Sequence, residues 1–128
     1  MSEIKVDTVS PRTSSTTITI GAAASNLTAL TSAATITIDF NDNNNFSVTL
    51  AHNAAFANPS NPTAGQTGSI FITQDGSGSR VPTWGSNWDF IGGTAPTLTT
   101  TAAGVDRIDY VILDATNIQA VATLNYSS

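Results

Sequence analysis

His52 is the one histidine in this 128-residue chain, and it could in principle act as the base of a nucleophilic triad. A Ser-His-Asp triad built on His52 is formally possible, but the chain contains no G-x-S-x-G nucleophile elbow. There is no cysteine, and a histidine-based zinc site needs several His or Cys ligands. We therefore expect His52 to be a surface or interface residue, and we expect no metal and no cofactor.

Residues 39–44 read DFNDNN and offer the D-x-N-x-N start of a calcium-binding loop. Asn44 stands where that loop requires glycine, and Leu50 stands at the twelfth position, where a glutamate is needed. We interpret the segment as a turn. Gly76-Ser77-Gly78 is likewise not followed by a helical pattern, so we do not expect it to bind phosphate.

Asp106 and Asp109 flank Arg107, and paired carboxylates can hydrolyse glycosides. We expect Asp106 to lie at a turn and the two carboxylates to form ion pairs with Arg107 or Arg80. No catalytic residue is assigned, and the chain is not expected to be an enzyme. A glycan hydrolase that uses His52, Asp106 and Asp109 is the enzymatic alternative.

Trp84, Trp88 and Tyr110 could form a platform on which sugars stack. Only 7% of the chain is aromatic, however, so we favour a role for these rings in the core. Residues 68–90, which end at Phe90, are predicted to form a strand, a Gly/Ser turn, a short strand, a second turn and a third strand. We expect the core to nucleate on this stretch.

The remaining strands follow from alternating apolar residues. Residues 34–40 and 45–50 are predicted to pair as a hairpin across the Asn-rich turn, and residues 51–68 to cross between sheets. Residues 97–101 form a further short strand. Residues 107–113 predict a central strand, joined by a turn at 114–117 to a strand over 118–126. Seven to nine strands without a helix predict an all-β domain over 34–128, a β-sandwich or jelly roll.

Residues 1–33 differ from the rest and are predicted to form an extended N-terminal arm. Two β-like runs are followed by a small, polar segment that cannot bury much by itself. A frayed terminus plus one ordinary strand of the sandwich is the alternative. The arm's apolar residues are its candidate contacts with a partner: Ile4, Val6, Val9, Ile18 and Ile20.

The composition limits the kinds of partner. A net charge of −5 with only four basic residues argues against binding to a nucleic acid backbone. No apolar run approaches the roughly 20 residues of a membrane span, and we expect no signal peptide. Charged residues make up 10% of the chain, and Lys5 is the only lysine available to protect strand edges from pairing. This favours an obligate oligomer.

Several segments resemble structural proteins of tailed-bacteriophage virions, notably those of cyanophages. Ser2 to Thr13 is similar to the N-terminus of such proteins, and four pieces of the body resemble a domain that occurs in them: residues 65–71, 74–80, 84–88 and 105–111. The resemblance covers most of the chain and brings no catalytic residue with it. Similar modules occur in fibres and in small head proteins.

The resemblance implies a capsid decoration (cement) protein, because the chain has no room for a fibre shaft of repeats. Family members of this kind are commonly homotrimers seated between capsomers, with N-terminal arms on neighbouring capsid subunits. We accordingly expect a structural virion protein on the capsid surface, with the major capsid protein as its partner. The alternative is a tail-fibre or adhesin module that binds a host receptor or glycan.

Overall fold

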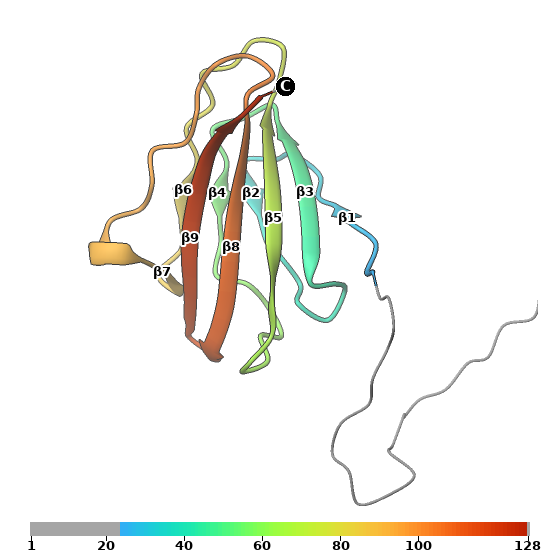
Figure 1. Ribbon diagram of the computed structural model, residues 1–128, viewed down its shortest axis with the longest axis vertical. Helices are drawn as coiled ribbons and strands as arrows, with labels where there is room; N and C mark the ends of the chain where they lie inside the picture. Colours follow the sequence, from blue (N-terminus) through green and yellow to red (C-terminus); the bar gives the residue numbers. More distant parts are fainter. Residues whose placement is uncertain (1–23, 128) are drawn as a thin grey trace, which may run out of the picture.

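The computed structural model describes residues 24–127, which form two β-sheets packed face to face (Figure 1). The large sheet has six strands in the order β1-β3-β5-β8-β9-β7, and the small sheet has the order β2-β4-β6. Between β7 and β8 lies the 3₁₀ turn η1 (Ile91–Gly93). The strands are β1 (Thr28–Ala29), β2 (Thr35–Ile36), β3 (Asn45–Leu50), β4 (Ala55–Phe56), β5 (Thr67–Gln74), β6 (Thr83–Trp84), β7 (Trp88–Phe90), β8 (Val105–Asp114) and β9 (Asn117–Tyr126).

The first six strands alternate between the two sheets. In the large sheet β1, β3 and β5 are parallel neighbours, and in the small sheet β2, β4 and β6 are parallel neighbours. The chain therefore winds as a coil around a shared core. The predicted all-β sandwich is confirmed, but its strand directions differ from the antiparallel Greek keys of a jelly roll.

The predicted hairpin between residues 34–40 and 45–50 is wrong. Residues 35–36 belong to the small sheet and pair with β4, whereas β3 belongs to the large sheet and pairs with β1 and β5. The apolar faces of both runs are buried as predicted. Alternation specifies which side of a strand faces the core, but it does not specify the partner strand. The loop at 41–44 carries the chain from one sheet to the other.

Three strands do form within residues 68–90, but they do not pair with one another. β5 lies in the large sheet, β6 lies in the small sheet, and β7 lies at the far edge of the large sheet beside β9. The turn after β5 is confirmed. Its Asp75 Oδ1 accepts hydrogen bonds from the backbone N–H groups of Ser77 and Gly78, and its Oδ2 lies 2.6 Å from Arg80 Nη2. The hydrogen bond from Arg80 lowers the pKa of Asp75.

The β8–β9 hairpin is confirmed, with its turn at residues 114–117. β8 pairs with β5 on one side and β9 on the other, so it is a central strand as predicted. The strand predicted at 97–101 is wrong, because this segment is irregular and only its Leu98 is buried. The predicted crossing of residues 51–68 between sheets is confirmed, since β4 lies within it.

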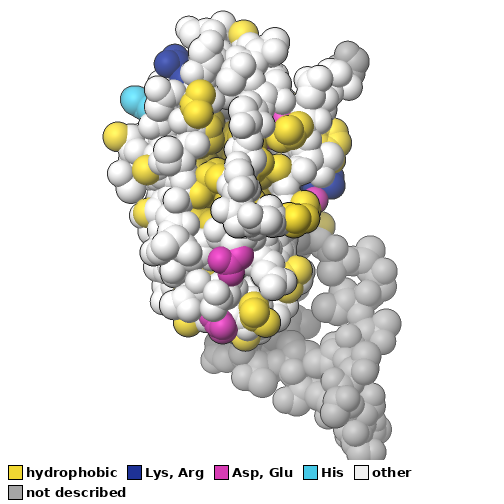
Figure 2. Space-filling view, turned by 90° about the vertical axis from the view of Figure 1, so that its left-hand side faces the viewer, with side chains coloured by type: hydrophobic (Ala, Val, Ile, Leu, Met, Phe, Trp, Pro, Cys, Tyr) yellow, Lys and Arg dark blue, Asp and Glu magenta, His cyan; other side chains and the backbone are white. Residues whose placement is uncertain are grey.

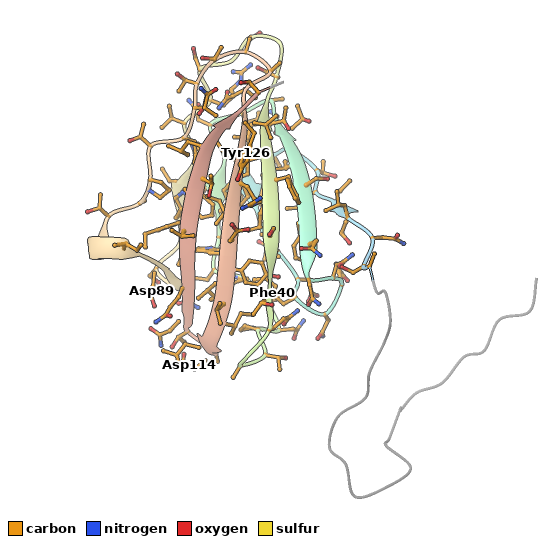
Figure 3. The ribbon with its side chains drawn as sticks, in the orientation of Figure 1. Phe40, Asp89, Asp114 and Tyr126 are labelled. Atoms are coloured by element: carbon orange, nitrogen blue, oxygen red, sulfur yellow. The ribbon has the colours of Figure 1, made fainter. Side chains whose placement is uncertain are left out.

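The core is one apolar layer between the sheets. Phe40 lies near its centre, with its ring 5.0 Å from the ring of Tyr110 and 6.1 Å from that of Phe46 (Figure 3). Each strand of the large sheet from β3 to β9 contributes side chains from its inward face. The buried apolar residues are Ile36, Ile38, Phe40, Phe46, Val48, Leu50, Ala54, Phe56, Ile70, Ile72, Trp88, Leu98, Ile108, Tyr110, Ile112, Ile118 and Ala120. Across residues 24–127 the structure has no helix that could cross a membrane.

The two tryptophans meet in the core with their rings 5.3 Å apart, but only one of them satisfies its indole N–H. Trp88 Nε1 donates to the backbone oxygen of Ala57 at 3.1 Å. Trp84 stacks on Phe56 at 4.6 Å, and its Nε1 is buried without a partner. An unpaired buried donor costs about 1–3 kcal/mol.

We expect Trp88→Phe to lower the free energy of unfolding by about 1–3 kcal/mol more than Trp84→Phe does. Both substitutions shorten the ring system equally, but only Trp88→Phe removes a hydrogen bond, whereas Trp84→Phe removes an unpaired donor. Urea denaturation of the two variants measures the difference. Equal losses would show that the Ala57 bond contributes nothing net.

Tyr110 is buried, and its hydroxyl donates to the backbone oxygen of Asn44 at 2.5 Å. Gly68 leaves room for this bond, because a Cβ at position 68 would lie 1.8 Å from the same oxygen. Burial raises the pKa of Tyr110 from 10.0 to about 12. The folded state therefore favours the neutral phenol.

This shift predicts a loss of stability at high pH. The folded-state pKa lies above the unfolded value, so the contribution of Tyr110 is fully present below pH 10 and disappears as pH rises toward about 12. Denaturation of the wild type should show this decline over that range, and Tyr110→Phe should lack it. The same slope in both proteins would assign the decline to other groups.

Candidate interaction surface

The outward face of the large sheet carries a small charged cluster. Arg107 Nε lies 2.9 Å from Asp109 Oδ1, and Ser69 Oγ donates to the same carboxylate at 2.6 Å. The Arg107 guanidinium also lies 5.2 Å from the centre of the Tyr126 ring. The predicted pairing of Asp109 with Arg107 is confirmed. Because these side chains are partly exposed, the pair adds little stability and serves mainly to neutralise charge on this face.

Asp106 was expected at a turn and in an ion pair, and both expectations are wrong. It lies within β8 with 2% of its surface exposed, on the face that also holds Ile108. Its Oδ2 accepts the backbone N–H of Thr99 at 2.7 Å, and its Oδ1 accepts that of Asn125 at 2.8 Å. The alternation of Ile108, Tyr110 and Ile112 predicts this inward direction, so the signal was present in the sequence.

The predicted face of β9 changes direction at Asn125. This residue has a positive φ of 59° within an irregular part of the β8–β9 pairing. Ile118 and Ala120 are buried as expected, but Tyr126 instead lies beside Arg107, toward the end of β9 opposite the Asp114 turn (Figure 3). The carboxylate of Asp106 holds the backbone at this bulge.

Exposed large apolar side chains gather on β8, β9 and η1. Ile91 is 81% exposed, Val111 50% and Val121 44%, and Leu113, Leu124 and Tyr126 lie on the same elements. A shallow groove of about 310 Å³ runs between Ile91, Val111 and Val121, with Gln119 and Ala120 among its lining residues. Figure 2 shows hydrophobic side chains along the edge of the molecule to which β7 and η1 belong. We call Ile91, Val111, Leu113 and Val121 the apolar patch.

The structure does not bring the candidate catalytic residues together. His52 is exposed, and its Nδ1 lies 3.1 Å from Ser32 Oγ, which also accepts the backbone N–H of Ala51. Asp106 and Asp109 point to opposite faces of β8, because three positions separate them along a strand. They therefore cannot act as a carboxylate pair on one substrate.

The acidic turn at residues 39–44 is confirmed as a turn. Asp39 Oδ1 accepts hydrogen bonds from Asn61 Nδ2 and from the backbone N–H of Asn41, each at 2.9 Å. Both bonds lower the pKa of Asp39, and the bond from Asn61 has the larger effect. Within residues 24–127 no three His, Cys, Asp or Glu side chains are grouped so that they could hold a metal ion.

The aromatic platform is not formed, because Trp88 and Tyr110 are buried in the core. The predicted core role of both rings is confirmed. Trp84 is partly exposed and lies beside a second cavity of about 330 Å³ at the β6–β7 edge, lined also by Ser86 and Phe90.

The five candidate arm contacts, Ile4, Val6, Val9, Ile18 and Ile20, lie outside the described residues. The end of the predicted arm is described. Its Thr28 and Ala29 form β1, the edge strand of the large sheet, in parallel register with Phe46 and Ser47 of β3. The neighbouring Leu30 donates its backbone N–H to Ser47 O at 2.8 Å.

Comparisons of the chain with protein-family models, with curated proteins and with solved structures found no match.

We expect Asp106→Ala to lower the free energy of unfolding by about 1–3 kcal/mol, because two backbone N–H groups lose their acceptor. Asp89→Ala removes the same group from an exposed position on β7 and should change stability by less than about 0.5 kcal/mol. Thermal or urea denaturation compares the two. If both variants match the wild type, Asp106 does not hold these loops.

Proposed function

We propose that the protein is a structural virion protein that decorates a bacteriophage capsid. In this proposal it binds between major capsid subunits through residues 1–33 and stabilises the assembled head as a cement protein. The resemblance of Ser2 to Thr13 and of the four body segments to phage structural proteins supports this role. The proposed role requires no catalytic residue and no cofactor.

The observation that carries the proposal is the way β1 joins the body. Thr28 and Ala29, at the end of the predicted arm, add a strand to the edge of the large sheet through backbone contacts with β3. Strand addition needs few specific side chains, because the backbone supplies the hydrogen bonds. The same chemistry would let the preceding residues of the arm pair with an exposed strand of a capsid subunit.

Contacts within the β domain connect segments that lie far apart in the sequence, so the domain can anchor such an arm. Three of the four resembling segments adjoin one another, since β5 pairs with β8 and the Gln74 side chain bonds both the backbone N–H and the backbone oxygen of Arg80. The proposed partners are the major capsid protein and two further copies of the chain in a homotrimer. Three arms on one trimer would raise the effective concentration of each at the shell.

Cementing then follows from mass action. A protein that binds the assembled shell more tightly than its separated subunits stabilises the shell by the free energy of that binding. The net charge of −5 opposes contact with nucleic acid or an anionic membrane surface, so neither is among the proposed partners.

A tail-fibre or adhesin module is the second candidate. The cavity beside Trp84, with Ser86 and Phe90 in its lining, is the observation that favours it, because a ring beside hydroxyl and backbone groups suits a sugar or receptor side chain. Trp88→Ala is a poor test of this role, since that ring is in the core. Ser86→Trp, which fills the cavity from an exposed position, should abolish glycan-array binding if this candidate is right.

Immunogold labelling of purified virions with an antibody to this chain tests the location. Gold distributed over the head is the expected result. Gold confined to the tail or its tip would reject the capsid role and favour receptor binding.

Deleting residues 1–20 tests the arm. We expect the truncated chain to keep its β-sheet circular dichroism and to lose cosedimentation with purified heads, because the described strands lie outside the deletion. Substituting Ile4, Val6 and Val9 together by serine is the gentler variant and should weaken binding in the same direction. Undiminished cosedimentation of the deleted chain would reject the arm as the binding element.

A further inference from the structure

We infer that the apolar patch of Ile91, Val111, Leu113 and Val121 is the surface through which copies of this chain associate. This deepens the homotrimer part of the proposed function, on which it rests. Of the eight large apolar side chains exposed within residues 24–127, six lie on β8, β9 and η1. Exposed apolar groups gathered in this way mark contact sites, whereas scattered ones need no explanation.

The shape of the patch is a projection beside a groove. Ile91 stands on η1, which protrudes from the edge of the large sheet (Figure 1), and its neighbours Gly92 and Gly93 have positive φ values of 71° and 69°. The groove beside it is lined by Val111 and Val121 on the outer face of β8 and β9. A projecting side chain beside a groove suits a cyclic assembly with heterologous interfaces. In such an assembly the projection of each copy enters the groove of the next copy, and the ring closes.

The size of the patch suits a weak contact that depends on protein concentration. Ten residues in β8 at about 3.3 Å each give a face roughly 33 Å long. The patch lies on β8 and β9, two ten-residue strands about 4.8 Å apart, so this face is roughly 10 Å wide, with η1 beside it. The resulting area of roughly 320 Å² is smaller than the roughly 800 Å² that each partner buries in a standard protein interface, which places the contact among weak ones.

Charge favours a copy of the same chain over a foreign charged partner. A chain of net charge −5 repels itself unless the contacting surfaces are locally neutral. Asp109 is the one charged residue that lines the groove, and its carboxylate is paired with Arg107. Asp89 lies beside Ile91 and Gln119 in an adjoining hollow, and Asp114 lies at the β8–β9 turn. The groove lining itself therefore holds no unpaired charge, as in the apolar centre of an interface that has a polar rim.

The absence of cysteine from the sequence permits a direct test on the full chain. Val111→Cys and Val81→Cys place one thiol each at positions of nearly equal exposure, 50% and 54%, and only the first lies in the patch. At concentrations at which light scattering shows association, maleimide should label Cys at 111 at least tenfold more slowly than in dilute solution. The rate at 81 should not change.

A second pair of variants tests the energetics. Val121→Lys should reduce the scattering mass to that of a single chain while the circular dichroism stays unchanged, and Val81→Lys should leave the association intact.

A wild type that is a single chain from micromolar to millimolar concentration would reject both the homotrimer and this surface. An oligomer in which position 111 stays fully reactive would reject the surface alone, and gold labelling on the tail would reject only the capsid location. Association that is lost on deletion of residues 1–23, with position 111 unprotected, would assign the contact to the arm.

Discussion

The structure depends on the burial of a single apolar layer between two sheets of unequal size. The small sheet has three strands, two residues long each, and it has little stability of its own. It is held in place because its inward residues complete the apolar layer of the large sheet, and because the winding chain contributes a strand to it on three separate passes. Long loops must join the sheets in such a coil, and their backbone groups need partners away from the ladders. Gln74 and Asp106 meet this need, since their buried side chains bond Arg80, Thr99 and Asn125.

Local features of this fold could be predicted from the sequence, and long-range ones could not. Alternation correctly identified the inward faces of β3, β5 and β8, and the turn chemistry located the β8–β9 hairpin. The parallel pairing of β1, β3 and β5 leaves no local trace, because the partners are separated by an excursion through the other sheet. The short runs before Phe40 and after Asn44 therefore suggested a hairpin that does not exist. Asp106 was misplaced for a different reason: its charge suggested a turn, whereas its phase with Ile108 indicated the interior.

The candidate surface likewise combines a local feature that the sequence predicts with a long-range feature that it does not. The sequence indicated the Arg107–Asp109 pair, because the two residues lie on one face of one strand. It gave no indication of the apolar patch, whose members come from η1, β8 and β9 and meet only through the sheet order. An exposed isoleucine at position 91 cannot be distinguished from a buried one until the turn that carries it is known. The proposed capsid role thus rests on the resemblance expected from the sequence, and the proposed contact between copies rests on tertiary placement.

The position of β9 in the sheet order also sets how much chain each pairing of the large sheet must enclose. The coil strands β1 to β6 precede β8 in the chain, whereas β5 pairs with β8 on one of its edges and β7, at the far edge of the described sheet, pairs with β9. The hairpin that fills the large sheet is the last of the described strands to be synthesised. Parallel pairings between distant segments form slowly, whereas a hairpin closes in microseconds. Among the pairings of the large sheet, the β8–β9 hairpin therefore closes the shortest loop, whereas each parallel pairing of the coil must close a much longer one.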